Sequence, residues 1–293
     1  MIITINMNFY KNIYSKESQV EIVYSIIIPV FNQEEIIVEN LKSIIDNTLG
    51  NFEIIIILDF CFDETEKNLF FFIENYKNTK TNFIQITIVK NQNLPLFETK
   101  CDNIGFKKSI GKYCLEIQGD MKMTEMGYNI HITKPFLILE NVIAVSGRCA
   151  HNLFNNKGIG KLSLEIERPT SELNICKNKF YVYETCNRGP LLIDKKKLEE
   201  LNFLDEENYF LDNSDHDLFA RAYLLKNYIC GYVPIDFEAP LCNGSTRNNK
   251  TYNFCKEYFI NKNEKERLQK KMGYSLGKYK NVWSEREPTT YDI

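Results

Sequence analysis

The chain has 293 residues, of which 44% are hydrophobic, so it can bury a full core and lies near the upper size of one domain. Its 36 basic and 39 acidic residues give a formal net charge of −3. A protein whose main partner is nucleic acid usually carries a basic surplus or a dense basic stripe. The totals and the residue order show neither, so we expect no nucleic-acid partner.

The nine cysteines are an odd number, and none forms a C-x-x-C pair. Zinc sites need clustered thiolates or imidazoles, and secreted scaffolds need paired cysteines, so we expect reduced thiols. No stretch reaches the roughly 18 to 20 apolar residues that span a bilayer. The N-terminus lacks the basic start, apolar middle and cleavage site of a signal peptide. These features predict a soluble, cytoplasmic protein without a transmembrane segment; they leave open peripheral membrane association and the oligomeric state.

Strand and helix patterns alternate along the first half of the chain, after an expected N-terminal extension at 1–22. Short, continuous apolar runs predict buried strands, and apolar residues at helical spacing predict the helices between them. The expected strands are 25–30, 52–58, 83–89 and 113–117, and the expected helices are 34–50, 64–76 and 98–110. Strands separated by helices of this length form βαβ units. We therefore predict an α/β fold with an open, mostly parallel sheet flanked by helices.

The second half is less regular. The expected strands are 141–146, 177–183 and 228–233, the expected helices are 195–201, 215–227 and 253–271, and a polar, aromatic tail covers 273–293. We see no internal repeat and no low-complexity linker. The simplest division is the extension at 1–22, one α/β domain at 23–240, and a C-terminal helix and tail at 241–293.

Three polar or acidic segments directly follow buried strands, at 32–35, 59–63 and 118–121. In open parallel sheets, ligands bind beyond the carboxyl ends of the strands. We therefore expect these three segments to lie together and to form the binding site.

The order of these segments resembles that of the family 2 glycosyltransferases of the GT-A fold, a Rossmann-like α/β architecture. The resemblance covers residues 24–232. It opens at 25–35 with S-I-I-I-P-V-F-N-Q-E-E, a strand, a Pro-x-x-Asn break and a helix start. In that family this element forms the first wall of the nucleotide pocket. The resemblance implies donor contacts at Pro29, Phe31, Asn32 and Glu34.

A second match is L-D-F-C-F-D-E-T at 58–65, which is similar to the acidic loop that follows the second strand in that family. The resemblance implies that Asp59 contacts the base or the ribose of the donor and that Asp63 supports the loop. Aspartate is also common at helix N-caps, so the alternative for Asp63 is a purely structural start of the next helix.

A third match is C-D-N-I-G-F-K-K-S-I-G-K-Y-C-L-E-I-Q-G-D-M at 101–121, which is similar to the family's Asn-x-Gly helix, Gly-x-Tyr turn, strand and Asp-x-Asp metal motif. It implies donor contacts at Asn103, Gln118, Gly119 and Asp120. A nucleoside diphosphate leaving group concentrates negative charge, which a divalent cation with oxygen ligands can neutralise. Gln118 replaces the first acid of the motif, so Asp120 is the expected ligand of Mn²⁺ or Mg²⁺, bound weakly without nucleotide. The alternative is an ordinary turn after a strand.

A fourth match consists of N-R-G-P-L-L-I-D at 187–194 and F-L-D-N-S-D-H-D-L-F-A-R-A-Y at 210–223. In the family these segments border the acceptor site and supply the catalytic base from a Glu-Asp motif, which makes Asp215 the expected base. The expected residues on the acceptor side are Arg188, Gly189, Pro190, Ser214, His216 and Asp217. The segment from Ser214 to Asp217 also has the form of a capping box, in which these residues would only start a helix. Asn243 stands where many family members place a metal-binding histidine.

The resemblance implies transfer of a sugar from a nucleoside-diphosphate sugar to a hydroxyl of a glycan, lipid or protein acceptor. The implied mechanism is an inverting single displacement, and the implied class is a hexosyl- or N-acetylhexosaminyltransferase. The changes at Gln118, Ser214 and Asn243 support an alternative, a catalytically weakened member that binds nucleotide-sugar or glycan. A nucleotidyltransferase is a third hypothesis, and the lack of a Gly-rich basic phosphate loop before the first helix opposes it.

Overall fold

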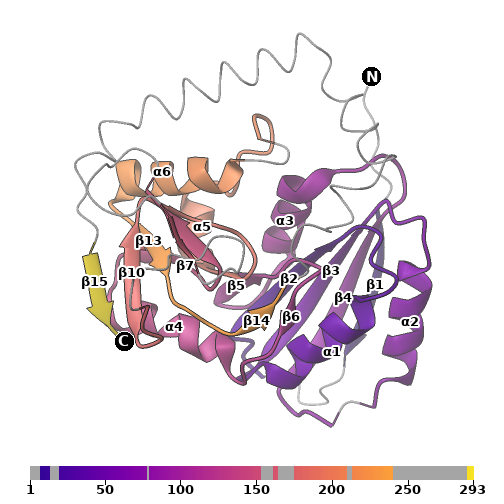
Figure 1. The fold of residues 1–293 in the computed structure, drawn as a ribbon. Coiled ribbons are helices and arrows are strands. Elements are labelled where there is room, and N and C mark those ends of the chain that lie inside the picture. Colours follow the sequence, from indigo (N-terminus) through magenta and orange to yellow (C-terminus); the bar gives the residue numbers. More distant parts are fainter. Residues whose placement is uncertain are drawn as a thin grey trace.

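A ten-stranded mixed sheet forms the centre of the computed structural model, with the strand order β1-β4-β3-β2-β5-β12-β7-β13-β10-β15 (Figure 1). The structure describes residues 7–13, 20–77, 79–152, 161–163, 175–209, 213–239 and 289–293. The expected helix at 253–271 and Asn243 lie outside these residues. None of the helices described is long and apolar enough to cross a membrane, and none of the seven cysteines described forms a disulfide.

The first half of the chain confirms the predicted alternation of strands and helices. Its elements are β2 (Tyr24–Val30), α1 (Ile37–Asn47), β3 (Phe52–Asp59), α2 (Thr65–Asn75), β4 (Phe83–Asn91), α3 (Phe97–Lys108) and β5 (Tyr113–Glu116). The four strands pair in parallel in the order β4-β3-β2-β5. Every residue of β3 is buried, because helices cover both faces of this part of the sheet.

The second half completes the sheet with strands of both directions. Its main elements are α4 (Tyr128–Ile138), β7 (Val142–Ser146), β10 (Lys179–Tyr183), β12 (Leu191–Asp194), α5 (Lys195–Glu200), α6 (Ser214–Lys226) and β13 (Ile229–Tyr232). The short strands are β6 (Lys122–Met123), β8 (Cys149–His151), β9 (Lys161–Ser163), β11 (Thr185–Cys186) and β14 (Phe237–Glu238). β12 runs antiparallel between β5 and β7, so the sheet has a parallel core within a mixed arrangement.

The two outermost strands come from the ends of the chain. β1 (Met7–Ile13) pairs antiparallel with β4, so the N-terminal segment supplies an edge strand that the sequence analysis did not predict. β15 (Thr289–Asp292), at the end of the expected tail, pairs antiparallel with β10 at the opposite edge.

Two hydrophobic layers hold helices to the two faces of the sheet. One contains side chains of α1, α2 and α4, and the other contains side chains of α3, α5 and α6. Gly105 allows α3 to lie close to β2, because a Cβ atom at this position would come within 2.3 Å of Ile27. This close contact holds α3 against β2, and the first turn of α3 lies next to the candidate site.

One edge of the sheet gathers the segments that the sequence analysis singled out. Because β12 is antiparallel to both β5 and β7, these two strands point the same way, and Leu191 of β12 pairs with Glu116 on one side and Ser146 on the other. The carboxyl ends of β2, β3, β5 and β7 and the start of β12 therefore share an edge. Ligand sites of open α/β sheets lie at such edges.

Candidate functional site

The loops after β2 and β3 lie side by side, as predicted, and hydrogen bonds connect them. The backbone N–H of Phe62 donates to Asn32 Oδ1 at 3.0 Å, and that of Glu64 donates to Glu34 Oε2 at 2.8 Å. Asp63 accepts from Glu34 N at 3.2 Å and from Thr65 N, in the first turn of α2, at 3.0 Å. Asp63 thus supports the loop and the start of the helix together. Both of its proposed structural functions agree with this geometry.

Asp59 is only 3% exposed at the end of β3, and its carboxylate anchors the start of α3. It accepts hydrogen bonds from Leu96 N at 2.8 Å, Phe97 N at 3.0 Å and Asn91 Nδ2 at 2.8 Å. Burial raises the pKa of Asp59 above its usual value, and these hydrogen bonds oppose that rise. The contact with a base or ribose stays a prediction, whereas the anchoring of α3 is what the described contacts provide.

Asn103 is buried, and its side-chain amide holds the loop that follows α5. Its Nδ2 donates to Leu204 O at 2.9 Å, and its Oδ1 accepts from Leu204 N at 3.1 Å. The asparagine of the Asn-x-Gly helix therefore connects α3 to the loop after α5. The donor contact implied for Asn103 stays a prediction.

The turn of the candidate metal motif is fixed by contacts from both sides. Gln118 Nε2 donates to Glu98 Oε1 at 2.9 Å, and Arg148 Nη1 donates to Gln118 Oε1 at 3.1 Å. Gly119 O accepts from Asn40 Nδ2 at 2.6 Å. A side chain at Gly119 would crowd the backbone next to Pro29, since its Cβ would lie 3.1 Å from Pro29 O. Asp120 follows as a half-buried residue at the end of this turn.

Next to this turn lies a buried group of charges that we call the Arg188 cluster; it consists of Glu98, Asp102, Glu116 and Arg188. Arg188 Nη1 donates to Asp102 Oδ2 at 2.8 Å, and its Nη2 lies 3.4 Å from Glu98 Oε2. The N–H of Gly189 donates to Glu116 Oε2 at 2.5 Å. The three acids and Arg148 were missed by the sequence analysis. Glu116 carried a signal, since it is a charge within the apolar run Y-C-L-E-I.

The Arg188 cluster holds more carboxylates than it can pair in the described part of the chain. There, Asp102 Oδ1 and Glu116 Oε1 have no hydrogen-bond partner. Burial raises the pKa of Asp102 to about 7, against the lowering effect of Arg188. Burial, Asp102 and Glu98 raise the pKa of Glu116 well above its usual value. The cluster therefore retains protons at pH values where exposed carboxyl groups are ionised.

Asp215 lies in the first turn of α6 and is 7% exposed. Burial alone would raise its pKa, but His216, Arg188 and the backbone N–H of His216, which donates at 2.9 Å, outweigh burial and lower it. The pKa of Asp215 therefore lies below its usual value, whereas the pKa values of Asp102 and Glu116 in the neighbouring cluster lie above theirs. Opposite protonation states in neighbouring carboxyl groups are a feature of acid–base sites.

The capping-box interpretation of the start of α6 is wrong. Ser214 is already helical, and its Oγ lies 3.0 Å from Thr99 Oγ1 of α3 rather than bonding to its own helix. Asp217 instead accepts from Arg221 Nε at 2.7 Å, one turn along α6. A contact between two helices thus replaces the local pattern, which leaves Asp215 as the acid of this turn that faces Arg188.

The acceptor-side segment packs against the donor-side turn. The peptide bond between Gly189 and Pro190 is cis, and Gly189 has a φ of 60°. A Cβ atom at Gly189 would lie 2.8 Å from Gln118 Cγ, so this close approach requires glycine. His216 Nδ1 lies 4.0 Å from Asp215 Oδ1, and its ring packs edge-on against His151 at 5.9 Å between centroids. The structure thus joins the segments predicted separately for donor and acceptor.

Within the residues described, no three His, Cys, Asp or Glu side chains are placed to hold a metal ion. Gln118 Oε1 accepts from a guanidinium, which makes that oxygen a poor cation ligand. Asp120 is then the carboxylate of the motif turn, and a cation there would need further oxygens from a diphosphate. This donor set fits a metal only together with nucleotide.

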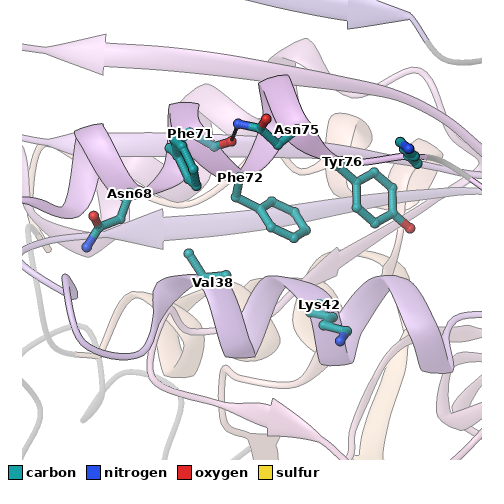
Figure 2. A pocket seen from close by; sticks show the side chains of 8 residues that line it. Val38, Lys42, Asn68, Phe71, Phe72, Asn75 and Tyr76 are labelled. Atoms are coloured by element: carbon teal, nitrogen blue, oxygen red, sulfur yellow. Dashed lines mark hydrogen bonds between the residues drawn. The ribbon is translucent and has the colours of Figure 1, made fainter.

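A hollow of about 540 Å³ lies elsewhere, between α1 and α2. Figure 2 shows Phe72 of α2 pointing toward Val38 of α1, with Tyr76 and Lys42 further along. The lining is largely apolar and includes none of the predicted site residues. We therefore place the functional site at the strand ends rather than in this hollow.

Comparisons with known proteins show which family and which fold the chain resembles. Residues 25–118, about a third of the chain, match the model of the glycosyl transferase family 2, so this segment is similar to domains of that family. No curated protein sequence matches the chain.

Solved structures similar to the chain show the GT-A fold. One is TarS 1-349 of S. aureus, at 16% identity and a TM-score of 0.52 over 74% of this chain and 60% of that chain. A second is the mannosyltransferase PcManGT from Pyrobaculum calidifontis with GDP-Man and Mn²⁺, at 14% identity and a TM-score of 0.54 over 90% and 74% of the two chains. A third is GalNAc-T7 with UDP, GalNAc and Mn²⁺, at 13% identity and a TM-score of 0.55 over 74% and 43%. The chain thus spans 60% of the length of TarS 1-349.

Proposed function

We propose that the chain transfers a sugar from a nucleoside-diphosphate sugar to an acceptor hydroxyl. The observation that carries the proposal is the series of contacts that links the Gln118–Asp120 turn to Arg188, the residue next to Asp215 in the electrostatics of the site. The chain of contacts runs from Gln118 through Glu98 to Arg188, whose charge in turn lowers the pKa of Asp215. The match of residues 25–118 to the glycosyl transferase family 2 model supports this proposal, with Asp215 as the proposed base and the Gln118–Asp120 turn as the proposed diphosphate site.

The chemistry we propose is an inverting single displacement. Asp215 takes the proton of the acceptor hydroxyl, and the resulting oxygen forms a bond to the anomeric carbon. The bond from that carbon to the diphosphate breaks on the opposite face, and its electron pair leaves with the nucleoside diphosphate. Positioning and general base catalysis supply the rate, and the lowered pKa of Asp215 keeps the base ionised at the cost of basicity.

Asp120 is the residue that we propose as ligand of Mn²⁺ or Mg²⁺ when nucleotide is bound. A divalent cation there would neutralise charge on the departing diphosphate. The proposed donor class is a hexose or N-acetylhexosamine carried by a nucleoside diphosphate. Support comes from the ligands of the similar structures, GDP-Man for PcManGT and UDP with GalNAc for GalNAc-T7. Glycans, lipids and proteins remain the proposed acceptor classes.

A second candidate is a domain that binds nucleotide-sugar or glycan without efficient transfer. The specific observation in its favour is Gln118, whose amide is engaged on both sides and brings no charge to the motif. Asp59 also supports this candidate, since its carboxylate already accepts hydrogen bonds from the backbone N–H groups of Leu96 and Phe97.

Asp215→Asn separates these candidates. The change keeps size and shape but removes the base, so transfer should fall by about 10² to 10⁴ while donor affinity persists. The measurement is release of nucleoside diphosphate from UDP- and GDP-sugars with acceptor panels, with donor affinity by calorimetry. Asp236→Asn is the matched control, since this acid is exposed and pairs with Lys177.

Equal transfer by Asp215→Asn and the parent would defeat the catalytic assignment. A parent that binds a nucleotide-sugar but transfers none would favour the binding domain.

A further inference from the structure

We propose that Arg148 binds the diphosphate of the donor and supplies a fixed positive charge at the Gln118–Asp120 turn. The inference deepens the proposed function and rests on it. It starts from one contact, the 3.1 Å hydrogen bond from Arg148 Nη1 to Gln118 Oε1. That bond places a guanidinium within a few ångströms of the turn where the leaving diphosphate is expected.

The backbone around Arg148 is held in place before any ligand arrives. Arg148 N and Cys149 N both donate to Ser146 Oγ, at 3.0 and 3.2 Å. The preceding residue, Gly147, donates from its N–H to Pro190 O at 2.9 Å. The first two bonds connect the segment between β7 and β8 to the end of β7, and the third connects it to the acceptor-side segment. A side chain carried by such a segment is preorganised, which lowers the entropy that binding must overcome.

The neutral side chain of Gln118 suits a contact with Arg148. A neutral amide accepts the hydrogen bond of Arg148 without cancelling its charge, whereas an aspartate there would form an ion pair with it. The other end of the amide donates to Glu98, whose second oxygen lies 3.4 Å from Arg188. Gln118 therefore separates the charge of Arg148 from the acids of the Arg188 cluster.

The chemistry of a guanidinium suits a diphosphate oxygen. It remains charged over the accessible pH range and carries five N–H donors in a planar fork, so it can hold Gln118 and a phosphate oxygen together. Arg148 is half-buried, so its charge is less screened than on an open surface. The ligand class is a nucleoside diphosphate, and the contact is specific for the phosphate next to the sugar.

The test compares nucleoside diphosphate with nucleoside monophosphate in the full chain. Calorimetry with UDP, UMP, GDP and GMP, in EDTA and again with Mn²⁺, gives the affinity ratio of diphosphate to monophosphate for each base. Loss of a charge-assisted hydrogen bond in Arg148→Ala should weaken diphosphate binding roughly ten- to a hundredfold in EDTA and leave monophosphate binding nearly unchanged. Arg148→Lys, which keeps the charge but not the fork, should recover part of the ratio.

Lys196→Ala is the matched control, since it removes one positive charge from an exposed position of α5. Thermal unfolding of each variant shows whether it folds, and Arg148→Gln, which removes the charge but keeps much of the side chain, carries the test if the alanine variant does not. A parental diphosphate-to-monophosphate ratio in the folded variant that lacks the charge overturns the inference and leaves the proposed function standing. A parent that binds neither nucleoside diphosphate overturns both.

Discussion

The two parts of the site are built in different ways. The loops after β2 and β3 are joined by hydrogen bonds from backbone N–H groups to Asn32, Glu34 and Asp63, all near the surface. The Arg188 cluster is buried and joins α3 to the start of β12, across 86 positions between Arg188 and Asp102. The first part resembles helix capping in its chemistry. The second consists of charges removed from water, which are costly unless paired. We therefore expect the same kind of substitution to have different effects in the two parts.

The largest effect on stability should come from Arg188→Met. It removes the partner of Asp102 and leaves a buried carboxylate unpaired, which typically costs about 3 to 5 kcal/mol of the free energy of unfolding. Urea denaturation followed by circular dichroism measures this loss. The double variant Arg188→Met with Asp102→Leu should regain much of it. A single variant as stable as the parent would show that the cluster is not a buried ion pair in solution.

A smaller effect should separate Asp59 from Asp63. Asp59→Ala leaves the buried N–H groups of Leu96 and Phe97 without their acceptor. Each unpaired N–H group should lower the free energy of unfolding by about 1 to 3 kcal/mol. Asp63→Ala loses a partly exposed cap-like contact, worth about 1 kcal/mol. Melting temperatures of the two variants give the order directly. The reverse order would contradict the anchoring of α3 by Asp59.

A separate effect should appear in the pH dependence of stability. The pKa of Asp102 is raised from 3.8 to about 7, so the folded state holds a proton that the unfolded state releases between these values. Stability contributed by this group therefore falls as pH rises from about 4 to about 7 and is level above that. Asp102→Asn should remove this part of the slope. Free energies of unfolding at pH 5 and pH 8 measure it.

Glu74→Gln is the control for the pH series, since Glu74 is exposed on α2. An equal slope in the parent and in Asp102→Asn would assign the proton to another group.

The parts predicted well from sequence depend on local patterns. The alternation of apolar runs and helical spacing located β2 to β5 and the helices between them, because a strand buried on both faces must be continuously apolar. The adjacent loops at 32–35 and 59–63 followed from the geometry of a parallel sheet. The start of α6 was left open in the sequence analysis, because a short polar pattern fits both a cap and a contact with a distant helix, and the contact of Ser214 with Thr99 of α3 decided against the cap.

The charges of the Arg188 cluster could not be predicted in the same way. Glu98 and Asp102 lie on α3, and acidic residues on helices usually face solvent. Nothing near them in the sequence indicates that they contact an arginine far along the chain. Arg148 follows a strand that was predicted correctly, but its contact with Gln118 depends on the antiparallel insertion of β12. Glu116, the acid within the apolar strand Y-C-L-E-I, was the one residue whose sequence context indicated a buried charge. A charge at a position that the strand pattern buries implies a partner, though not its identity.

The placement of β1 and β15 at the two edges of the sheet affects how the protein can be shortened. Without β1, the edge of β4 would present unpaired N–H and C=O groups along a strand of nine residues, seven of them buried here. Exposed edges of this kind pair with other chains and promote aggregation. Removing residues 289–292 would uncover β10 in the same way, over a shorter length. A fragment that lacks both edge strands should therefore lose solubility before its candidate site is disturbed.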